Sequence, residues 1–562
     1  MPGKFLEGIA DGTVTVRLKD SIHPILPTQL GVNTTFRSGA SMATDRVPLY
    51  LESGWGVYRF PAGSGSNIYF WDGNAPDSAK VDFTPIIGTK AKYLTPAGFA
   101  TFKKAVNGEA TVVVNYFYAR YGITPEGTRK ARVLQAARYA AGFVRRMNVE
   151  LGAHVKYWEI GNECYGSWET GHVVDGVPVT GKEYGEDLRV FAREMKKADP
   201  NIKIGAVVYS KDGDWNRQVL AEAKDAADFL VVHNYFNSFK HTTYQDIMSG
   251  LPQIGEIKAM LDTLTQTVAG KPAGYFPVAM TEYNNRGNLT TTMANAIFVS
   301  EVLGELMKNG YGMATLWVGE WKWAPGTHGV IAVSDPDQPD YSPRQAYMDF
   351  RYYHAYFGDY LIGASSGNDS VKVYASRFSD SSIGLSLINE ASTDRKIRIN
   401  VTGLSDTARF GNAYWYEVYA ENIREANKKF YINGQTGTTP GGGPEDFAGI
   451  RPYGSPFENH AIVKLRPYSV NFMVIRVKRK ATGVASNPHY GLKVYPNPAE
   501  NSFRISGIRK VLSLRIFNTK GETVYSLMHP SGCINIEDLH RGVYLLQVNT
   551  PSGAFYTKII KL

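Results

Sequence analysis

Two glutamates, each at the end of a short apolar run, are the residues of this sequence best placed to do chemistry. Glu163 ends the run YWEIGNE (residues 157–163), and Glu282 ends the run VAMTE (residues 278–282). Two carboxylates that face one another across a pocket can cleave a glycosidic bond, because one protonates the leaving oxygen while the other attacks or activates water. The alternative for each residue is a glutamate at a strand end that forms a surface ion pair.

The elements that must position these glutamates alternate between short β-rich runs and helical patterns over residues 29–350. This alternation predicts an α/β fold, a (β/α)8 TIM barrel over residues 1–350. The amphipathic segments Thr128–Asn148, Gly185–Ala198 and Met293–Asn309 are three of its expected helices. The eight expected strands are Leu30–Thr35, Gly56–Phe60, Ala110–Tyr116, Val155–Ile160, Lys203–Val208, Phe229–Tyr235, Phe276–Glu282 and Met313–Val318. Both glutamates then lie at the mouth of the barrel, where this fold keeps its active sites.

Beyond about residue 351 the pattern changes to strands and turns. We expect a β-sandwich over residues 351–480, to which residues 1–28 contribute through the run Thr13–Arg17. Residues 481–489 are small and polar and predict a linker. Residues 490–562 predict a small all-β unit. Three domains also agree with a length of 562 residues, which is too long for one core.

Composition limits the classes of partner. The 12% aromatic content, with 35 tyrosines and 9 tryptophans, suits a protein that stacks sugars on aromatic rings, although exposed sheets are also rich in tyrosine. The net charge is +9, but the basic residues are scattered and no zinc-ligand spacing accompanies them. This favours a solvated surface over nucleic-acid binding and leaves an attraction to acidic polysaccharide open. No apolar run is long enough to span a membrane.

Cys164 and Cys533 are the two cysteines, and they fall in different predicted domains. We therefore expect no disulfide between them and no cysteine metal cluster. His233 has no second ligand at metal-site spacing along the chain, so we expect no metal and no cofactor.

The pair Asn162-Glu163 after an apolar strand, with a second strand-terminal glutamate 119 residues later (282 − 163), resembles the retaining glycoside hydrolases of clan A. The resemblance implies that Glu163 is the general acid/base, that Asn162 binds the sugar 2-hydroxyl and that Glu282 is the nucleophile. An acid that works near neutrality must have a raised pKa. Retaining enzymes hold the two carboxyl groups about 5–5.5 Å apart.

Further residues near the strand ends match supporting positions of the same clan. Tyr235 ends the run VVHNY (residues 231–235) and is implied to hydrogen-bond the nucleophile, unless it only packs. His233 in that run is either a pocket residue or a buried core histidine. Arg59 ends strand two and is implied to orient the nucleophile through a charge-assisted hydrogen bond. The GSGSN stretch after it (residues 63–67) lacks the lysine of a phosphate loop and predicts a flexible barrel loop.

Within the clan, residues 55–285 are most similar to the α-L-arabinofuranosidases of glycoside hydrolase family fifty-one. The similarity is carried by RFPAG (59–63), WDG (71–73), GNE (161–163), GSWE (166–169), EYG (183–185) and ADP (198–200). Two features depart from it. Strand one, GVNTT (31–35), lacks the glutamate with which that family grips arabinose. Strand eight carries Trp317, Trp321 and Trp323, which are either stacking platforms for pyranose rings or packing residues.

The sequence thus predicts a secreted retaining glycosidase, similar to the α-L-arabinofuranosidases, that acts on plant or algal polysaccharide or oligosaccharide. One alternative is an endo-acting β-glucanase or xylanase on the same barrel, favoured by the tryptophans of strand eight. Another is a non-catalytic carbohydrate-binding surface protein. The presence of Glu163, Glu282 and Arg59 together argues against it, because binding alone does not need this pair.

The C-terminal 70 or so residues resemble the sorting domain recognised by the type IX secretion system. The resemblance is carried by LKVYPNP (492–498), LRIFN (514–518), GVYLLQV (542–548) and KIIKL (558–562). It implies a secreted or cell-surface protein whose partner is the type IX secretion machinery; an ordinary fibronectin-like module is the alternative. Cargo of this system first crosses the inner membrane on a signal peptide, which residues 1–5 do not resemble. We therefore expect the natural start of the chain to lie upstream.

Overall fold

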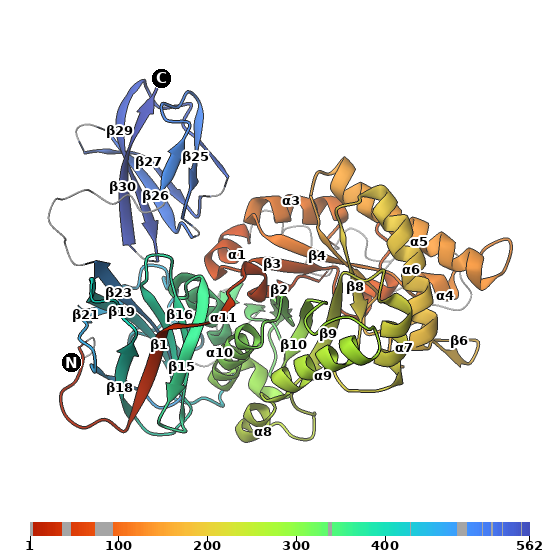
Figure 1. Cartoon of the computed structure of the whole chain (residues 1–562), viewed down its shortest axis with the longest axis horizontal. Helices are drawn as coiled ribbons and strands as arrows, with labels where there is room; N and C mark the ends of the chain where they lie inside the picture. Colours follow the sequence, from red (N-terminus) through yellow and green to blue (C-terminus); the bar gives the residue numbers. More distant parts are fainter. Residues whose placement is uncertain are drawn as a thin grey trace.

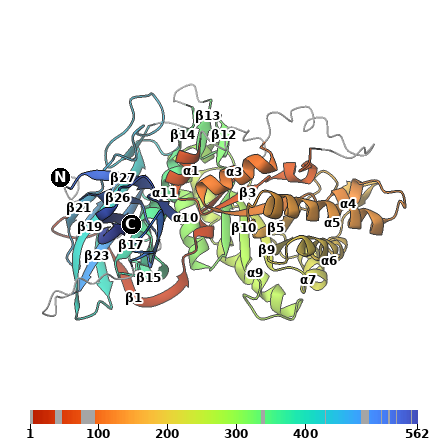
Figure 2. The same cartoon turned by 90° about the horizontal axis from the view of Figure 1, so that it is seen from above.

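The computed structural model describes residues 4–35, 46–73, 94–334, 340–426, 429–479, 492–508, 510–518, 521–530, 532–551 and 553–562. The linker predicted over residues 481–489 lies outside these ranges. Within them, no helix is both long enough and apolar enough to cross a membrane. Figures 1 and 2 show the barrel at one end of the molecule and the all-β parts at the other.

Eight parallel strands close into a barrel, as the alternating pattern predicted. Around the barrel their order is β10-β11-β2-β3-β4-β5-β8-β9. Their bounds are β2 (Gly31–Asn33), β3 (Val57–Phe60), β4 (Glu109–Val114), β5 (Tyr157–Ile160), β8 (Lys203–Val207), β9 (Phe229–Tyr235), β10 (Val278–Asn284) and β11 (Met313–Leu316). The strands are buried on both faces, which explains why they read as continuous apolar runs.

Helices surround the barrel and share its core. Their bounds are α1 (Val47–Ser53), α3 (Pro96–Val106), α4 (Tyr118–Tyr121), α5 (Arg129–Arg145), α6 (Gly181–Ala198), α7 (Asp214–Ala223), α8 (Tyr244–Ser249), α9 (Gln253–Thr267), α10 (Met293–Lys308) and α11 (Gln345–Tyr356). Helix α6 begins at Gly181, four residues before its predicted start. The reason is Thr180, whose hydroxyl accepts the N–H of Glu183 and caps the helix.

The end of strand β10 differs from the prediction, and this difference affects the position of Glu282. It continues to Asn284 instead of stopping at Glu282. Its pairing with β9 shifts by one residue between Met280 and Glu282, so that Glu282 lies opposite His233. Such a β-bulge locally re-aims side chains.

A ten-stranded sheet packs beside the barrel around a core of its own. Strand β1 (Gly12–Pro24) belongs to it and pairs with β15 (Tyr360–Ser366) and β18 (Arg395–Thr402), which Figure 1 shows as a red strand among green ones. The remaining strands are β16 (Val371–Arg377), β17 (Ile383–Asn389), β19 (Ala408–Ala420), β20 (Phe430–Ile432), β21 (Tyr453–Pro456), β22 (Ile462–Leu465) and β23 (Ser469–Arg479). The N-terminal segment therefore ties this sheet to the first barrel strand.

The C-terminal unit is all-β and has a third, separate core. It comprises β24 (Lys493–Tyr495), β25 (Ser502–Ser506), β26 (Ser513–Phe517), β27 (Thr523–Met528), β28 (Cys533–Asn535), β29 (Gly542–Thr550) and β30 (Gly553–Lys561). Lys510 of this unit donates to the carbonyl of Phe357 at 3.0 Å, and His529 lies 3.4 Å from a carboxylate oxygen of Glu52. Cys164 and Cys533 are both free thiols.

Candidate active site

Glu163 leaves the end of β5 on a sharp turn. Gly161 has a φ of +80°, and a side chain there would meet the Cys164 sulfur. Glu163 itself has a φ of +42°, a left-handed conformation that is uncommon for any residue but glycine. Strained backbone of this kind collects at functional sites. The turn directs the Glu163 side chain into the mouth of the barrel, where it is 16% exposed.

Glu282 reaches the same pocket from the bulge in β10. The Tyr235 hydroxyl donates to Glu282 Oε1 at 2.7 Å, and Arg59 Nη1 lies 3.4 Å from Glu282 Oε2. Glu282 is 7% exposed. Its carboxylate is thus fixed by one phenol and one guanidinium, both from residues that the sequence placed at strand ends.

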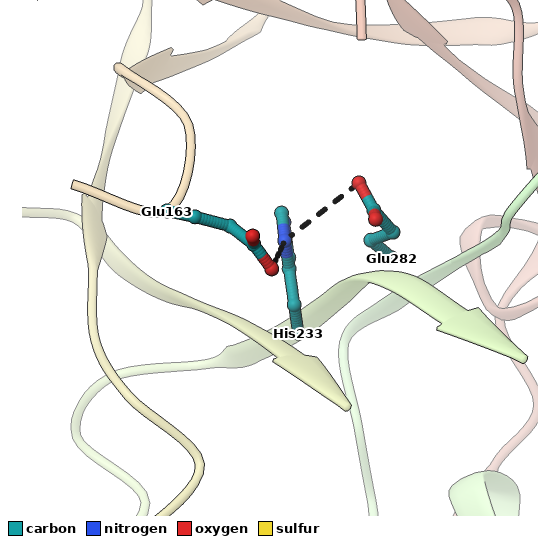
Figure 3. A group of neighbouring side chains, drawn as sticks. All are labelled: Glu163, His233 and Glu282. Carbon is teal, nitrogen blue, oxygen red and sulfur yellow. Dashed lines mark hydrogen bonds and ion pairs between the residues drawn. The ribbon is translucent and has the colours of Figure 1, made fainter. Parts of the chain in front are cut away.

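His233 stands between the two glutamates (Figure 3). Its Nδ1 is 3.1 Å from Glu163 Oε1 and 3.7 Å from Glu282 Oε2, while its Nε2 is 3.2 Å from the Thr281 hydroxyl. One oxygen of Glu163 and one of Glu282 lie within 4.8 Å of one another. The bulge at Thr281 produces this arrangement, because it brings Glu282 opposite His233.

Arg59 is fully buried beneath the pair and makes four contacts. Its closest ion pair is with Glu159, at 2.9 Å from Nε to Oε2; Glu159 also accepts the Thr111 hydroxyl at 2.8 Å. The other guanidinium nitrogens reach the side-chain oxygens of Asn33 at 3.2 Å and Asn162 at 2.9 Å, besides Glu282. Sequence reasoning missed Glu159, although a carboxylate inside an apolar strand signals a buried partner.

Asn33 lies in strand one, which lacks the glutamate that the arabinofuranosidase resemblance implies. Its side-chain nitrogen donates to the backbone carbonyls of Thr281, Thr315 and Leu316 at 3.0–3.2 Å. Its side-chain oxygen accepts a hydrogen bond from Arg59, so both ends of the amide hold neighbouring strands together. Asn33 therefore has a structural role inside the barrel.

Glu169 is another buried carboxylate beside the pair, and we noted its motif in the sequence without assigning it a role. It accepts hydrogen bonds from Ser64 at 2.7 Å, Asn67 at 2.6 Å and Asn162 at 3.1 Å. Burial, with the charges of Glu163 and Glu282, raises the pKa of Glu169 to about 8, although the Ser64 and Asn67 hydrogen bonds oppose the rise. Glu169 and Arg59 together fix which way the Asn162 amide faces.

The two central carboxyls have opposite pKa shifts. Burial raises the pKa of Glu163, but hydrogen bonds from His233, Trp168 and Tyr165 outweigh burial and bring it below its ordinary value. Burial also raises the pKa of Glu282, and the Glu163 charge adds to the rise against His233, Arg59 and Tyr235. The raised pKa expected for the acid therefore falls on Glu282 and not on Glu163, because His233, Trp168 and Tyr165 hydrogen-bond to Glu163. The two groups titrate as a pair.

Aromatic side chains surround the mouth. Trp168 donates its indole N–H to Glu163 Oε2 at 2.7 Å and is 61% exposed. On the strand-eight side, Trp317 and Trp321 are half-buried with ring centroids 6.2 Å apart. An added Cβ at Gly63 would lie 2.4 Å from the Trp317 ring, so the loop after β3 packs directly on this tryptophan. Trp323 is also half-buried.

Glu163, His233 and Glu282 offer three ligand atoms at a spacing that a metal ion could bridge. Spacing along the sequence did not indicate this set, because the fold alone brings the three together. The carboxylates are already bound by Trp168, Tyr235 and Arg59. The positive charge of Arg59 disfavours a second cation there, so the donor set suits an acid/base pair better than a metal centre.

The C-terminal unit matches a family model at residues 493–562, described as a secretion system C-terminal sorting domain. The chain is 29% identical over 219 residues to an intracellular exo-α-(1→5)-L-arabinofuranosidase from Acetivibrio thermocellus. That match covers 35% of this chain and 40% of the relative, so the chain matches well under half the length of this curated relative.

Solved structures share the fold over most of the chain. An α-L-arabinofuranosidase from Thermotoga maritima in complex with arabinose has a TM-score of 0.62 and 19% identity, covering 83% of this chain and 99% of the other. CelM2, a bifunctional glucanase-xylanase from a metagenome library, has a TM-score of 0.58 and 14% identity, covering 84% and 99%. These likenesses establish a TIM barrel with an accompanying sheet domain.

Proposed function

We propose that this chain is a retaining glycoside hydrolase that resembles the α-L-arabinofuranosidases in its chemistry. The observation that carries the proposal is the approach of the Glu163 and Glu282 carboxylates to within 4.8 Å. Retaining enzymes hold their carboxyls about 5–5.5 Å apart, whereas inverting enzymes leave about 6.5–9.5 Å for a water molecule. The spacing supports direct attack by one carboxylate on the sugar.

In the first step a Glu282 oxygen attacks the anomeric carbon while Glu163 gives its proton to the leaving oxygen. The glycosidic bond breaks, and a glycosyl ester forms on Glu282. In the second step Glu163 takes a proton from water, and the resulting hydroxide releases the sugar and restores Glu282. Tyr235 and Arg59 orient the nucleophile, and Asn162 is placed to bind the sugar 2-hydroxyl.

Two observations bear on the substrate. The 29% identity over 219 residues to a curated arabinofuranosidase favours an arabinofuranoside. The half-buried Trp317 and Trp321 at the rim favour an alternative, an endo-acting β-glucanase or xylanase, because such rings stack on pyranose chains. A non-catalytic carbohydrate-binding protein is less well supported, because ionisable groups buried this closely are costly unless they are used.

The match of residues 493–562 supports export and attachment or release at the cell surface through the type IX secretion machinery. The substrate is then a polysaccharide or oligosaccharide met outside the cell. In this proposal the C-terminal unit is a secretion signal and takes no part in catalysis.

Hydrolysis of aryl α-L-arabinofuranoside, aryl β-xyloside and aryl β-glucoside, with Glu282→Gln as the inactive control, tests the proposal. We expect release of the aryl group from the arabinofuranoside by the wild-type chain only. Cleavage of the xyloside or glucoside, with long products from soluble polysaccharide, would select the endo-acting alternative. No hydrolysis of any glycoside would contradict the proposal.

A further inference from the structure

Arg286 lies at the barrel mouth two residues beyond β10, beside the loop that follows β9. Its guanidinium carbon is 4.7 Å from the centre of the Tyr235 ring and 5.0 Å from that of Phe239. The Tyr235 hydroxyl donates to Glu282, so the Tyr235 ring lies between the Arg286 guanidinium and the proposed nucleophile. Phe239 is 72% exposed.

The backbone of Arg286 is held in place by a neighbouring side chain. Asn237 accepts the Arg286 N–H at 2.7 Å and donates to the Arg286 carbonyl at 2.8 Å. The next residue, Gly287, has a φ of +100°, and an added Cβ there would lie 2.5 Å from Thr242. Only glycine fits this conformation and this contact. The loop that presents Arg286 is therefore fixed at both ends.

The guanidinium of Arg286 has no acidic partner among the residues that the structure describes. No carboxylate of these residues forms an ion pair with it, and no side-chain hydrogen bond engages it. By contrast, Arg59 and Arg46 at the same mouth are paired with Glu159 and Glu320. The neighbouring His328 adds no competing positive charge: burial, with the charges of Arg286 and Arg344, lowers its pKa to about 4 and keeps the ring neutral.

We propose that Arg286 binds an anionic group of the glycan, a uronate carboxylate or a sulfate ester, on a sugar at or next to the catalytic pair. A guanidinium that stacks on aromatic rings keeps its N–H edges free, and these edges match the two oxygens of such an anion. The stacking also reduces the rotamer freedom that binding would otherwise remove. That the anion belongs to a glycan rests on the proposed function.

The test measures binding to acidic chains and to their neutral derivatives. Dissociation constants for the full chain are obtained by affinity gel electrophoresis with polygalacturonate and its carboxyl-reduced form, and with a sulfated galactan and its desulfated form. We expect at least one acidic chain to bind about tenfold more tightly than its neutral derivative, and the better chain identifies the anion. Arg286→Gln should remove this difference, and Arg286→Lys should retain part of it.

Arg217→Gln is the matched control, because it removes one positive charge from α7, where the Arg217 side chain is 48% exposed. It should keep the wild-type difference. The inference is overturned if wild-type protein binds both members of each pair equally, if Arg286→Gln keeps the difference, or if Arg217→Gln loses as much. Failure of aryl arabinofuranoside hydrolysis would reject the proposed function separately, because this binding test needs no turnover.

Discussion

Trp168 donates its indole N–H to the Glu163 carboxylate at 2.7 Å while most of its ring faces solvent. One side chain thus touches the proposed acid and presents an aromatic surface beside it. Because the proposed acid must lie next to the leaving group, we expect that group to depart on the Trp168 side of the pocket. The same hydrogen bond stabilises ionised Glu163 and opposes the protonation that the first step needs.

Trp168→Phe should move the alkaline limb of the pH profile of kcat/KM upward by about one pH unit, because a hydrogen bond to a charged group contributes about 1.5–3 kcal/mol. The shift is upward because the Trp168 indole N–H stabilises ionised Glu163. Without this donor the doubly ionised pair of carboxylates is less stable, so the last proton leaves at higher pH. Profiles on an aryl glycoside measure the shift. An unchanged limb would show that this hydrogen bond does not control the pair.

Glu163→Ala and Glu282→Gln should separate the two roles. The first variant should lose about 10²–10⁴-fold on substrates that need protonation of the leaving group, and less on activated aryl glycosides. Azide should partly rescue it by attacking the glycosyl-enzyme. Glu282→Gln should abolish turnover on both kinds of substrate, because no other group forms the intermediate. Glu186→Ala on α6 is the control. Equal losses on both substrates without rescue would mean that the roles are misassigned.

Trp317→Ala should raise KM for polysaccharide more than for a short aryl glycoside if the ring is a stacking platform. Trp317→Phe keeps an aromatic ring against Gly63, so its KM for polysaccharide should lie between those of the wild-type chain and Trp317→Ala. Melting temperatures of both variants are the control. A large loss of thermal stability in Trp317→Ala would instead identify the residue as barrel packing, and the arabinofuranoside interpretation would gain support.

Deletion of residues 490–562 should leave hydrolysis nearly intact, because this unit has a core of its own and contacts the rest of the chain through few residues such as Lys510 and His529. In the native host the truncated protein should remain in the periplasm. Cell fractionation with activity measured in each fraction checks both points. Unchanged export would contradict the sorting role.

How far the sequence could predict the site depends on where each residue lies. Glu163 and Glu282 were visible because a charged residue at the end of an apolar strand is easy to recognise. The bulge that re-aims Glu282 could not be predicted from the sequence, since the shift depends on the pairing between β9 and β10. Glu169 was also missed, because its burial depends on loops that follow different strands. Arg59 was expected beside the nucleophile, yet its closest ion pair is with Glu159, which lies in the interior of β5.

The most direct test of the double-displacement mechanism is covalent trapping. The wild-type chain is incubated with a 2-deoxy-2-fluoro aryl glycoside of the sugar that it hydrolyses, and the peptides are analysed by mass spectrometry. We expect one added glycosyl group, located on Glu282, and a first-formed product with retained anomeric configuration by NMR. Label on another residue, or an inverted product, would contradict this mechanism.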